Sequence, residues 1–255
     1  MYRSITAKQY KVHLGFPDDY QVDGVLCYGT LYENRTINAL KDALDELKIE
    51  ASLSALPHEF LQFGRELKIN NHTFWFMIGY GGAWISEYIH WACLFGSKKN
   101  ILLGSCGGLR KGIRQGDFII PESSYGEESS VRIYNRKSPI QFTDTKLSEK
   151  LKSILENNSV KVWRGPMVTC QAMIGETRQD IQQWSKQGYY GVEMEASTVI
   201  AVSNHFNVPV ACSMYVGDNL IEEHNTLSDE YEKEADARRQ NQKLQIKAAL
   251  QILLD

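Results

Sequence analysis

Short apolar runs alternate along the chain with segments whose apolar residues recur at every third or fourth position. A short apolar run between glycine or polar residues is typical of a buried strand, and the longer spacing is typical of a helix. The predicted strands cover residues 25–28, 74–78, 100–103, 117–121, 160–164, 165–169 and 209–216. The predicted helices cover residues 34–47, 86–95, 144–156, 178–186, 194–204 and 229–254.

This alternation of strand and helix predicts an α/β fold with a mostly parallel sheet and helices on both of its faces. The polar segment 123–144 interrupts the alternation, and we expect a long loop or a surface excursion there. No linker rich in proline, glycine or serine and no internal repeat divides the 255 residues. We therefore expect a single domain over residues 1–255.

Four of the predicted strands end in glycine or small polar residues. These ends are residues 29–30, 79–82, 104–108 and 217–218. Glycine lets backbone N–H groups approach a ligand closely, and ligands of open α/β sheets bind beyond the carboxyl ends of the strands. Tight turns alone explain any one of these ends, but four of them together favour a binding site.

Two acidic residues, Glu193 and Glu195, flank Met194 at the start of a predicted helix. The helix dipole alone favours carboxylates at such a position. Alternatively, a carboxylate accepts two hydrogen bonds at once, which suits the vicinal hydroxyls of a sugar. Asp218 follows a largely apolar strand. It is either an ordinary turn or cap residue, or a partly desolvated acid poised near neutral pH.

The composition favours a small-molecule ligand over nucleic acid, because a net charge of -3 leaves no excess of basic residues. The chain has neither an apolar stretch of about 20 residues nor the apolar core of a signal peptide, so we expect no membrane association and a cytoplasmic location. The five cysteines show no CxxC pair and no metal-ligand spacing, so we expect reduced thiols and no metal. A GxSxG elbow is absent, which leaves Ser105 without support as an esterase nucleophile.

Three longer segments carry a family resemblance. They are GVEMEASTVIAV at residues 191–202, LLGSCGGLRKGIRQGDFIIP at residues 102–121 and YVGDNL at residues 215–220. In order and spacing they resemble the nucleoside phosphorylase superfamily, which includes purine nucleoside phosphorylases, uridine phosphorylases and nucleosidases. The stretch LLGSCGGLR also resembles the AMP nucleosidase branch of that superfamily.

The resemblance implies a three-layer α/β/α sandwich around a mixed, partly barrel-like central sheet. It implies cleavage of the N-glycosidic bond of a purine nucleoside or nucleotide, with no metal or organic cofactor. Asp218 would protonate N7 of the departing purine, and Glu195 would bind the ribose hydroxyls, with Met194 under the sugar and Glu193 beside it. The other implied contacts are Met173, Val192 and Asn219 with the base, and Gly29, Gly104 and Ser105 with the nucleophile.

Two positions depart from the phosphorolytic members of the family. Those members place arginines, which bind phosphate bidentately, where this chain has Leu102 and, after the first predicted strand, Glu33. Arg35 lies nearby but is displaced. Hydrolysis is therefore favoured over phosphorolysis. The alternatives are a phosphate-dependent purine nucleoside phosphorylase, which would hold phosphate through Ser105, backbone amides and Arg35 or a basic residue of a neighbouring subunit, and a non-catalytic sensor of nucleosides or nucleotides.

Two further expectations concern the surface. The basic residues of segment 110–114 either meet a 5′-phosphate or form a solvated loop. The resemblance implies a homo-oligomer, because family members are dimers, trimers or hexamers. Trp84, Trp91 and Phe95 stand at helical spacing, and they belong either to a subunit interface or to the core.

Overall fold

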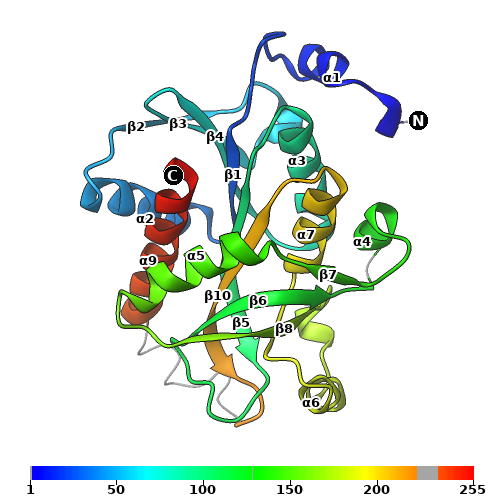
Figure 1. Ribbon diagram of the computed structural model, residues 1–255, viewed down its shortest axis with the longest axis vertical. Coiled ribbons are helices and arrows are strands. Elements are labelled where there is room, and N and C mark those ends of the chain that lie inside the picture. Colours follow the sequence, from blue (N-terminus) through cyan, green and yellow to red (C-terminus); the bar gives the residue numbers. More distant parts are fainter. Residues whose placement is uncertain (1, 128, 223–234) are drawn as a thin grey trace.

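The computed structural model describes residues 2–127, 129–222 and 235–255, in which one mixed sheet lies between layers of helices (Figure 1). In this described part the sheet contains ten strands. They are β1 (Gly24–Gly29), β2 (Ala51–Ala55), β3 (Gly64–Ile69), β4 (His72–Gly79), β5 (Asn100–Gly108), β6 (Phe118–Tyr125), β7 (Ile140–Phe142), β8 (Val162–Thr169), β9 (Gly191–Glu193) and β10 (Val210–Asn219).

Five of these strands close into a barrel. β5 pairs with β10, β10 with β6, β6 with β8, β8 with β9, and β9 again with β5. β5 also pairs in parallel with β1, from which β4, β3 and β2 continue as an open sheet. The prediction of a mixed, partly barrel-like sheet is confirmed.

Helices cover both faces of this sheet (Figure 1). One face packs against α3 (Gly82–Leu94) and α7 (Ala196–His205), and the other against α2 (Glu33–Glu46), α5 (Thr145–Glu156) and α9 (Ala235–Leu254). The remaining described helices are α1 (Ala7–Leu14), α4 (Ser129–Tyr134) and α6 (Arg178–Lys186), with short 3-10 turns at Tyr2–Ser4, Glu59–Leu61 and Met173–Gly175. The predicted three-layer α/β/α arrangement is therefore confirmed.

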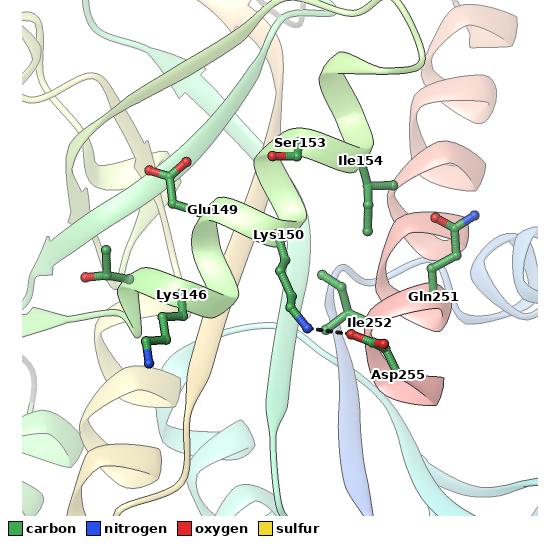
Figure 2. Close-up of a pocket in the computed structure, with 9 residues that line it drawn as sticks. Lys146, Glu149, Lys150, Ser153, Ile154, Gln251, Ile252 and Asp255 are labelled. Atoms are coloured by element: carbon green, nitrogen blue, oxygen red, sulfur yellow. Dashed lines mark hydrogen bonds and ion pairs between the residues drawn. The ribbon is translucent and has the colours of Figure 1, made fainter.

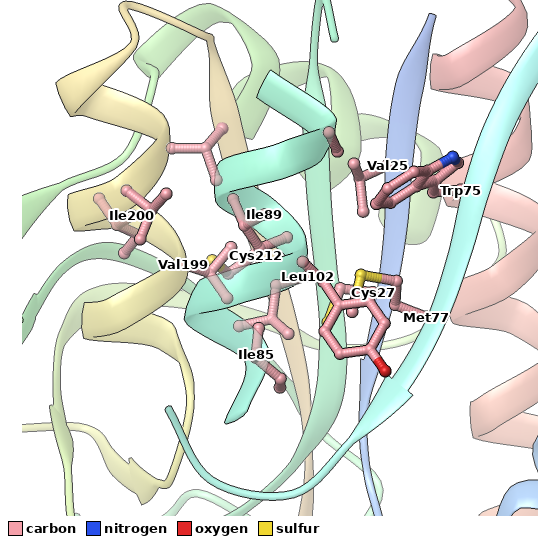
Figure 3. Close-up of a cluster of buried hydrophobic side chains, with 14 of the residues drawn as sticks. Val25, Cys27, Trp75, Met77, Ile85, Ile89, Leu102, Val199, Ile200 and Cys212 are labelled. Carbon is pink, nitrogen blue, oxygen red and sulfur yellow. The ribbon is translucent and has the colours of Figure 1, made fainter. Parts of the chain in front are cut away.

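Strand β1 illustrates why the sheet is buried on both faces. Val25 and Cys27 belong to the cluster formed with α3 and α7, which Figure 3 shows. Leu26 and Tyr28 belong to the cluster formed with α2, α5 and α9. Because successive side chains of a strand point to opposite faces, an uninterrupted apolar run must lie between two apolar layers.

The expectation of a long loop at residues 123–144 is wrong. β6 continues to Tyr125, helix α4 follows, and β7 pairs with β6 in the antiparallel direction. Polar side chains in this segment form long-range hydrogen bonds inside the fold. The hydroxyl of Ser124, for example, shares a hydrogen bond of 2.8 Å with the hydroxyl of Thr169 on β8. The polar composition therefore concealed a buried strand.

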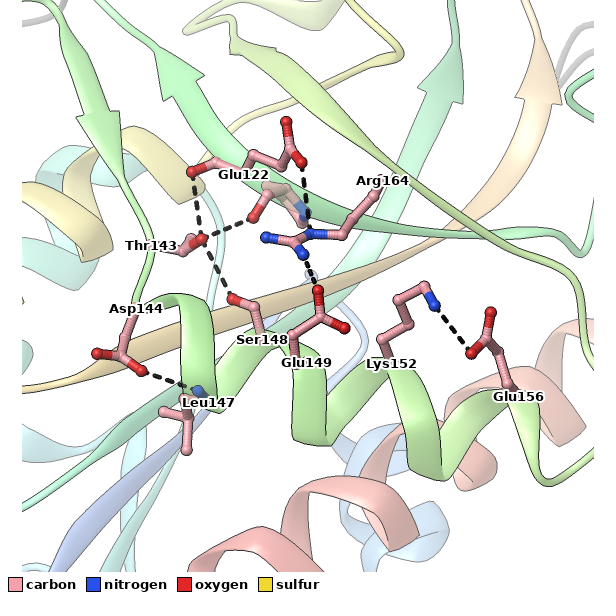
Figure 4. Close-up of polar contacts among 10 residues, drawn as sticks. Glu122, Thr143, Asp144, Leu147, Ser148, Glu149, Lys152, Glu156 and Arg164 are labelled. Atoms are coloured by element: carbon pink, nitrogen blue, oxygen red, sulfur yellow. Dashed lines mark hydrogen bonds and ion pairs between the residues drawn. The ribbon is translucent and has the colours of Figure 1, made fainter.

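Helix α5 begins where the sequence predicts, because Asp144 caps it. The Asp144 carboxylate accepts a hydrogen bond of 2.8 Å from the N–H of Leu147. Just before the cap, the Thr143 hydroxyl donates to the Pro121 carbonyl at 2.8 Å and accepts from the Ser148 hydroxyl at 3.2 Å (Figure 4). These contacts attach the start of α5 to the middle of β6.

At two of the four predicted strand ends, the strand continues through the glycine residues. Residues 104–108 belong to β5, and residues 217–218 belong to β10. A Cβ atom added at Gly107 would lie 2.6 Å from Leu220, so this glycine permits the segment after β10 to pack closely on β5. The other two glycine ends coincide with the points where β1 and β4 end.

Some elements and side chains are placed differently from the expectations. Helix α1 and strands β2 and β3 were not predicted, and residues 229–234 of the predicted last helix lie outside the described residues. Trp91 and Phe95 belong to the core, whereas Trp84 is 45% exposed. None of the described helices combines the length and the apolar character needed to cross a membrane.

Candidate active site

The carboxyl ends of β1 and β4 lie at one level of the sheet, beyond which β5 continues to Gly108. Gly29 of β1 is in register with Gly79 of β4 and with Gly104 of β5. Just beyond this level, the N–H of Thr30 donates to the Gly79 carbonyl at 2.8 Å. Beyond Gly29 the chain therefore follows β4 and leaves β5. This is the edge at which an α/β sheet binds its ligand.

Glu195 is buried at this edge, where α7 begins. Its Oε1 atom accepts a hydrogen bond of 2.7 Å from the N–H of Gly81, which caps the N-terminus of α3. Its other oxygen faces β1, since a Cβ atom on Gly29 would lie 2.4 Å from Oε2. Glycine at position 29 therefore makes room for the carboxyl group, and the carboxyl group is held between two strand ends.

Burial sets the electrostatics of this carboxyl group. Loss of hydration, with a second contribution from the charge of Glu193, raises the pKa of Glu195 to about 8. The hydrogen bond from Gly81 acts in the opposite direction. Glu195 is therefore a carboxyl group that ionises readily only when further hydrogen-bond donors reach it.

Glu193 is directed toward the protein. Its Oε2 atom accepts hydrogen bonds from the N–H groups of Glu195 (2.7 Å) and Ala196 (2.6 Å), and its Oε1 atom accepts one from the Thr169 hydroxyl. The carboxylate therefore stabilises the N-terminus of α7, where the helix dipole favours negative charge. It fixes the backbone that carries Glu195, and both of its oxygens have protein partners.

Asp218 lies on β10, next to an irregularity in the pairing with β5. The register shifts between Val216 and Asp218, and such a bulge re-aims the side chain that follows it. The side chain is 9% exposed, and a Cβ atom on the facing Gly107 would lie 3.4 Å from its Oδ1 atom. The Asp218 side chain is therefore largely buried beside β5, and its role as an acid stays a prediction.

Asn219 and Val192 are placed inside the fold. The Asn219 amide donates to the carbonyls of Arg110 (3.0 Å) and Ile113 (2.7 Å), and its oxygen accepts from the N–H groups of residues 221 and 222. Val192 packs in a small apolar cluster with residues from β8 and α6. Both side chains therefore have partners within the protein, and their contact with a base stays a prediction.

The remaining predicted residues differ in how far they are exposed. Ser105 is exposed although its neighbours on β5 are buried, and Gly104 is buried against the sulfur of Met214. Met173 is 49% exposed in the 3-10 turn after β8. Met194 is half-buried between the two glutamates.

Two groups near the site carried no signal in the sequence. Tyr80 lies between β4 and α3, and burial together with the charges of Glu195 and Glu176 raises its pKa. Glu176 follows the 3-10 turn, and burial together with the charge of Asp218 raises its pKa. It also forms a hydrogen bond with Cys170. Tyr80 and Glu176 therefore connect the surroundings of Glu195 with those of Asp218.

The two positions where phosphorolytic relatives were expected to carry arginine are occupied otherwise. Leu102 is fully buried in the core. Glu33 begins α2 and forms an ion pair with Arg65 of β3. The guanidinium of Arg35 stacks over the ring of Tyr32 at 4.4 Å. Arg65 is therefore paired with a carboxylate, whereas Arg35 has an aromatic partner and, within the described residues, no hydrogen-bond partner for its buried Nε atom.

Other features of the surface lie away from these residues. The side chains of Arg110, Lys111 and Arg114 are exposed, as expected for a solvated loop, and Arg110 stacks over Tyr190. A surface pocket of about 770 Å³ lies between α5 and α9, and none of its lining residues was predicted for the site (Figure 2). Within the described residues, no group of three or more metal-ligating side chains is arranged to hold an ion.

Comparison with known families decides where this architecture belongs. The family model described as "Phosphorylase superfamily" matches residues 65–251, which is most of the chain. This chain belongs to the phosphorylase superfamily.

Superfamily members of two activities are similar to it in sequence. A guanosine phosphorylase from Halorubrum lacusprofundi is 25% identical over 118 residues, which are 46% of this chain and 49% of the relative. A 5′-methylthioadenosine/S-adenosylhomocysteine nucleosidase from Exiguobacterium is 27% identical over 137 residues, which are 50% of this chain and 59% of the relative. The chain thus matches roughly half of the length of these relatives. The comparisons do not specifically support the AMP nucleosidase branch.

Solved structures of the superfamily share the fold over nearly the whole chain. A uridine phosphorylase from Vibrio fischeri superposes with a TM-score of 0.75 at 22% identity, covering 92% of this chain and 93% of that one. A 5′-methylthioadenosine/S-adenosylhomocysteine nucleosidase from Campylobacter jejuni gives 0.72 at 14% identity, covering 91% and 98%. At these identities the likeness supports the fold only.

Proposed function

We propose that this superfamily member cleaves the N-glycosidic bond of a purine nucleoside or nucleotide, with water as the second substrate. The observation that carries the proposal is the placement of Glu195. Its carboxyl group is buried at the strand ends, with Oε1 on the N–H of Gly81 and Oε2 beside Gly29. Such a group is suited to bind hydroxyls at the point where a ligand meets the sheet.

Glu195 has the chemistry to bind the ribose. The 2′ and 3′ hydroxyls are neighbouring donors, and an ionised carboxylate accepts both. Because burial raises the Glu195 pKa to about 8, the two new hydrogen bonds would favour the ionised form and lower that pKa on binding. The resulting negative charge then lies near the sugar, where the transition state develops positive charge.

In this proposal, Asp218 assists the leaving group. As the bond between C1′ and the purine N9 breaks, the electron pair stays with the base, and a proton delivered to N7 neutralises it. A water molecule adds its oxygen to C1′ and loses a proton, so the products are the free purine and ribose. Uracil has no N7, so this assignment favours purine over pyrimidine.

The choice of water over phosphate rests on the first turn of α2 and on β5. A phosphate dianion needs bidentate positive partners. Here Glu33 is paired with Arg65, Leu102 is buried, and Arg35 stacks on Tyr32. Phosphorolysis is the second candidate function, because Ser105 is exposed on β5 beside the strand ends and several relatives are phosphorylases.

Product analysis separates the two candidates. The protein is incubated with inosine, adenosine and guanosine in the presence of inorganic phosphate, and the sugar product is identified by phosphorus NMR and by a reducing-sugar assay. Free ribose with no ribose 1-phosphate supports hydrolysis. Ribose 1-phosphate formed in a one-to-one ratio with the base would replace this proposal by phosphorolysis.

A further inference from the structure

A buried amide on the C-terminal helix joins three of the strands that lead to the site. Gln245 of α9 is fully buried. Its Nε2 atom donates to the carbonyls of Gly104 (3.0 Å) and Ser213 (2.7 Å), and its Oε1 atom accepts from the Tyr28 hydroxyl at 2.9 Å. One side chain thus connects β5, β10 and β1.

The three contacts lie at the level where the sheet changes its pairing. The ladder between β1 and β5 ends at Gly29 and Gly104, and the N–H of Thr30 then donates to Gly79 on β4. Tyr28 immediately precedes Gly29 on β1, which makes room for Glu195. At the point where β1 leaves β5, the Gln245 side chain therefore still links the two strands.

A second amide on the same helix extends this connection. The Gln242 side chain, which is also buried, donates to the Thr36 hydroxyl at 2.9 Å. That hydroxyl in turn donates to the Tyr32 carbonyl at 2.8 Å, where α2 begins. The pair of glutamines attaches α9 to both sides of the loop between β1 and α2.

Only an amide provides this set of partners. Glutamine offers two donor hydrogens and an acceptor, whereas a glutamate carboxylate would accept only and would repel the two carbonyls. Methionine has a similar length and fills the space, but it donates nothing. A strand held in place by side-chain donors can shift when they are lost, and a displacement of about 1 Å at a reacting centre costs about 10²-fold in rate.

We propose that Gln245 is a positioning residue, which holds β1, β5 and β10 at the spacing that places Gly29, Ser105 and Asp218 around the substrate. It does so from the opposite layer, without touching the substrate. The kinetic part of this inference rests on the proposed function, and the structural part does not.

Asn100 provides a matched control on the same strand. It is the first residue of β5, fully buried like Gln245, and it donates to the Ser203 hydroxyl (2.9 Å) and the Cys93 sulfur (3.3 Å) and accepts from the Ser97 hydroxyl (2.7 Å). Both residues therefore anchor β5, but Asn100 does so at the end remote from Glu195 and Asp218.

The test compares Gln245→Met and Asn100→Leu in the full-length protein. Each variant is examined by urea denaturation, by kcat and KM for purine release, and by hydrogen exchange of backbone amides. We expect Gln245→Met to lower kcat about 10²-fold and to accelerate exchange in residues 104–108 and 213–219. The two variants are compared under conditions in which their free energies of unfolding are equal. We expect Asn100→Leu to keep the kcat of the wild type and to accelerate exchange near residue 100 instead.

A double variant separates positioning from stability. Tyr28→Phe combined with Gln245→Met removes the hydroxyl that the single change leaves without a partner, so it should regain stability and keep the kinetic defect. Equal kcat and equal exchange at residues 104–108 in Gln245→Met and Asn100→Leu would overturn the inference. If the wild-type protein releases no purine, the proposed function fails, and the exchange pattern alone decides the role of Gln245.

Discussion

Replacing Glu195 by glutamine should change how the stability of the protein depends on pH. Burial raises the pKa of this carboxyl group from 4.5 to about 8 in the folded protein. As pH rises, the unfolded chain therefore loses its proton first, and the wild-type protein loses stability between pH 4.5 and about 8. Below pH 4.5 the contribution of the Glu195 side chain to the stability of the folded protein is fully present. Above about pH 8 this contribution is lost.

The size of the effect follows from the same gap in pKa. Since one pKa unit corresponds to about 1.4 kcal/mol, the interval from 4.5 to about 8 corresponds to up to about 5 kcal/mol in the free energy of unfolding. Glutamine keeps an acceptor for the N–H of Gly81 and cannot ionise. The Glu195→Gln variant should therefore gain stability relative to the wild type as pH rises.

Urea denaturation at about pH 5, about pH 7 and about pH 9 measures this difference directly. Glu50→Gln is the control, because it makes the same chemical change at an exposed glutamate. Parallel stability curves for the wild type and Glu195→Gln across this range would refute the reasoning, since they would show that the carboxyl group is not buried with a raised pKa.

Three further predictions concern catalysis and packing. Asp218→Asn should lower kcat by about 10²- to 10⁴-fold with little change in nucleoside binding measured by calorimetry, because the amide cannot deliver the proton; an equal loss of binding would contradict the role. Gly29→Ala should destabilise the protein by about 1–3 kcal/mol in urea denaturation, because its Cβ atom would lie 2.4 Å from Glu195, whereas Gly175→Ala meets nothing closer than 3.5 Å; equal effects would argue against the crowding. The KM for a purine nucleoside should fall as pH rises toward about 8, because the ionised form of Glu195 binds the sugar hydroxyls. A KM that rises over this range in steady-state assays would contradict sugar binding by the ionised carboxylate.

The central strands could be predicted because their burial is visible in the sequence. The run from Val25 to Tyr28 has no polar position, and the structure places it between two helical layers. The segment with Ser124 could not be recognised as strand, because its polar side chains are satisfied by partners distant in sequence, such as Thr169. Gly107 suggested a turn, although it permits close packing against Leu220.

The candidate site shows the same division. Glu195 and Asp218 were chosen for their chemistry and for their place at strand ends, and the structure buries both there. The sequence did not reveal that Glu193 faces the N-terminus of α7, because the donors it meets are backbone groups. It gave no sign of Tyr80 or Glu176 either, because a single tyrosine or glutamate in a loop has no distinctive spacing.

The proposed hydrolysis of purine nucleosides or nucleotides is tested most directly by the release of free purine. The release is measured by chromatography with and without inorganic phosphate. The substrates are purine nucleosides, their 5′-phosphates and uridine. We expect purine to be released at the same rate with and without phosphate, and uridine not to be cleaved. Release that requires phosphate, or no release of purine from any of these compounds, would contradict the proposed hydrolysis.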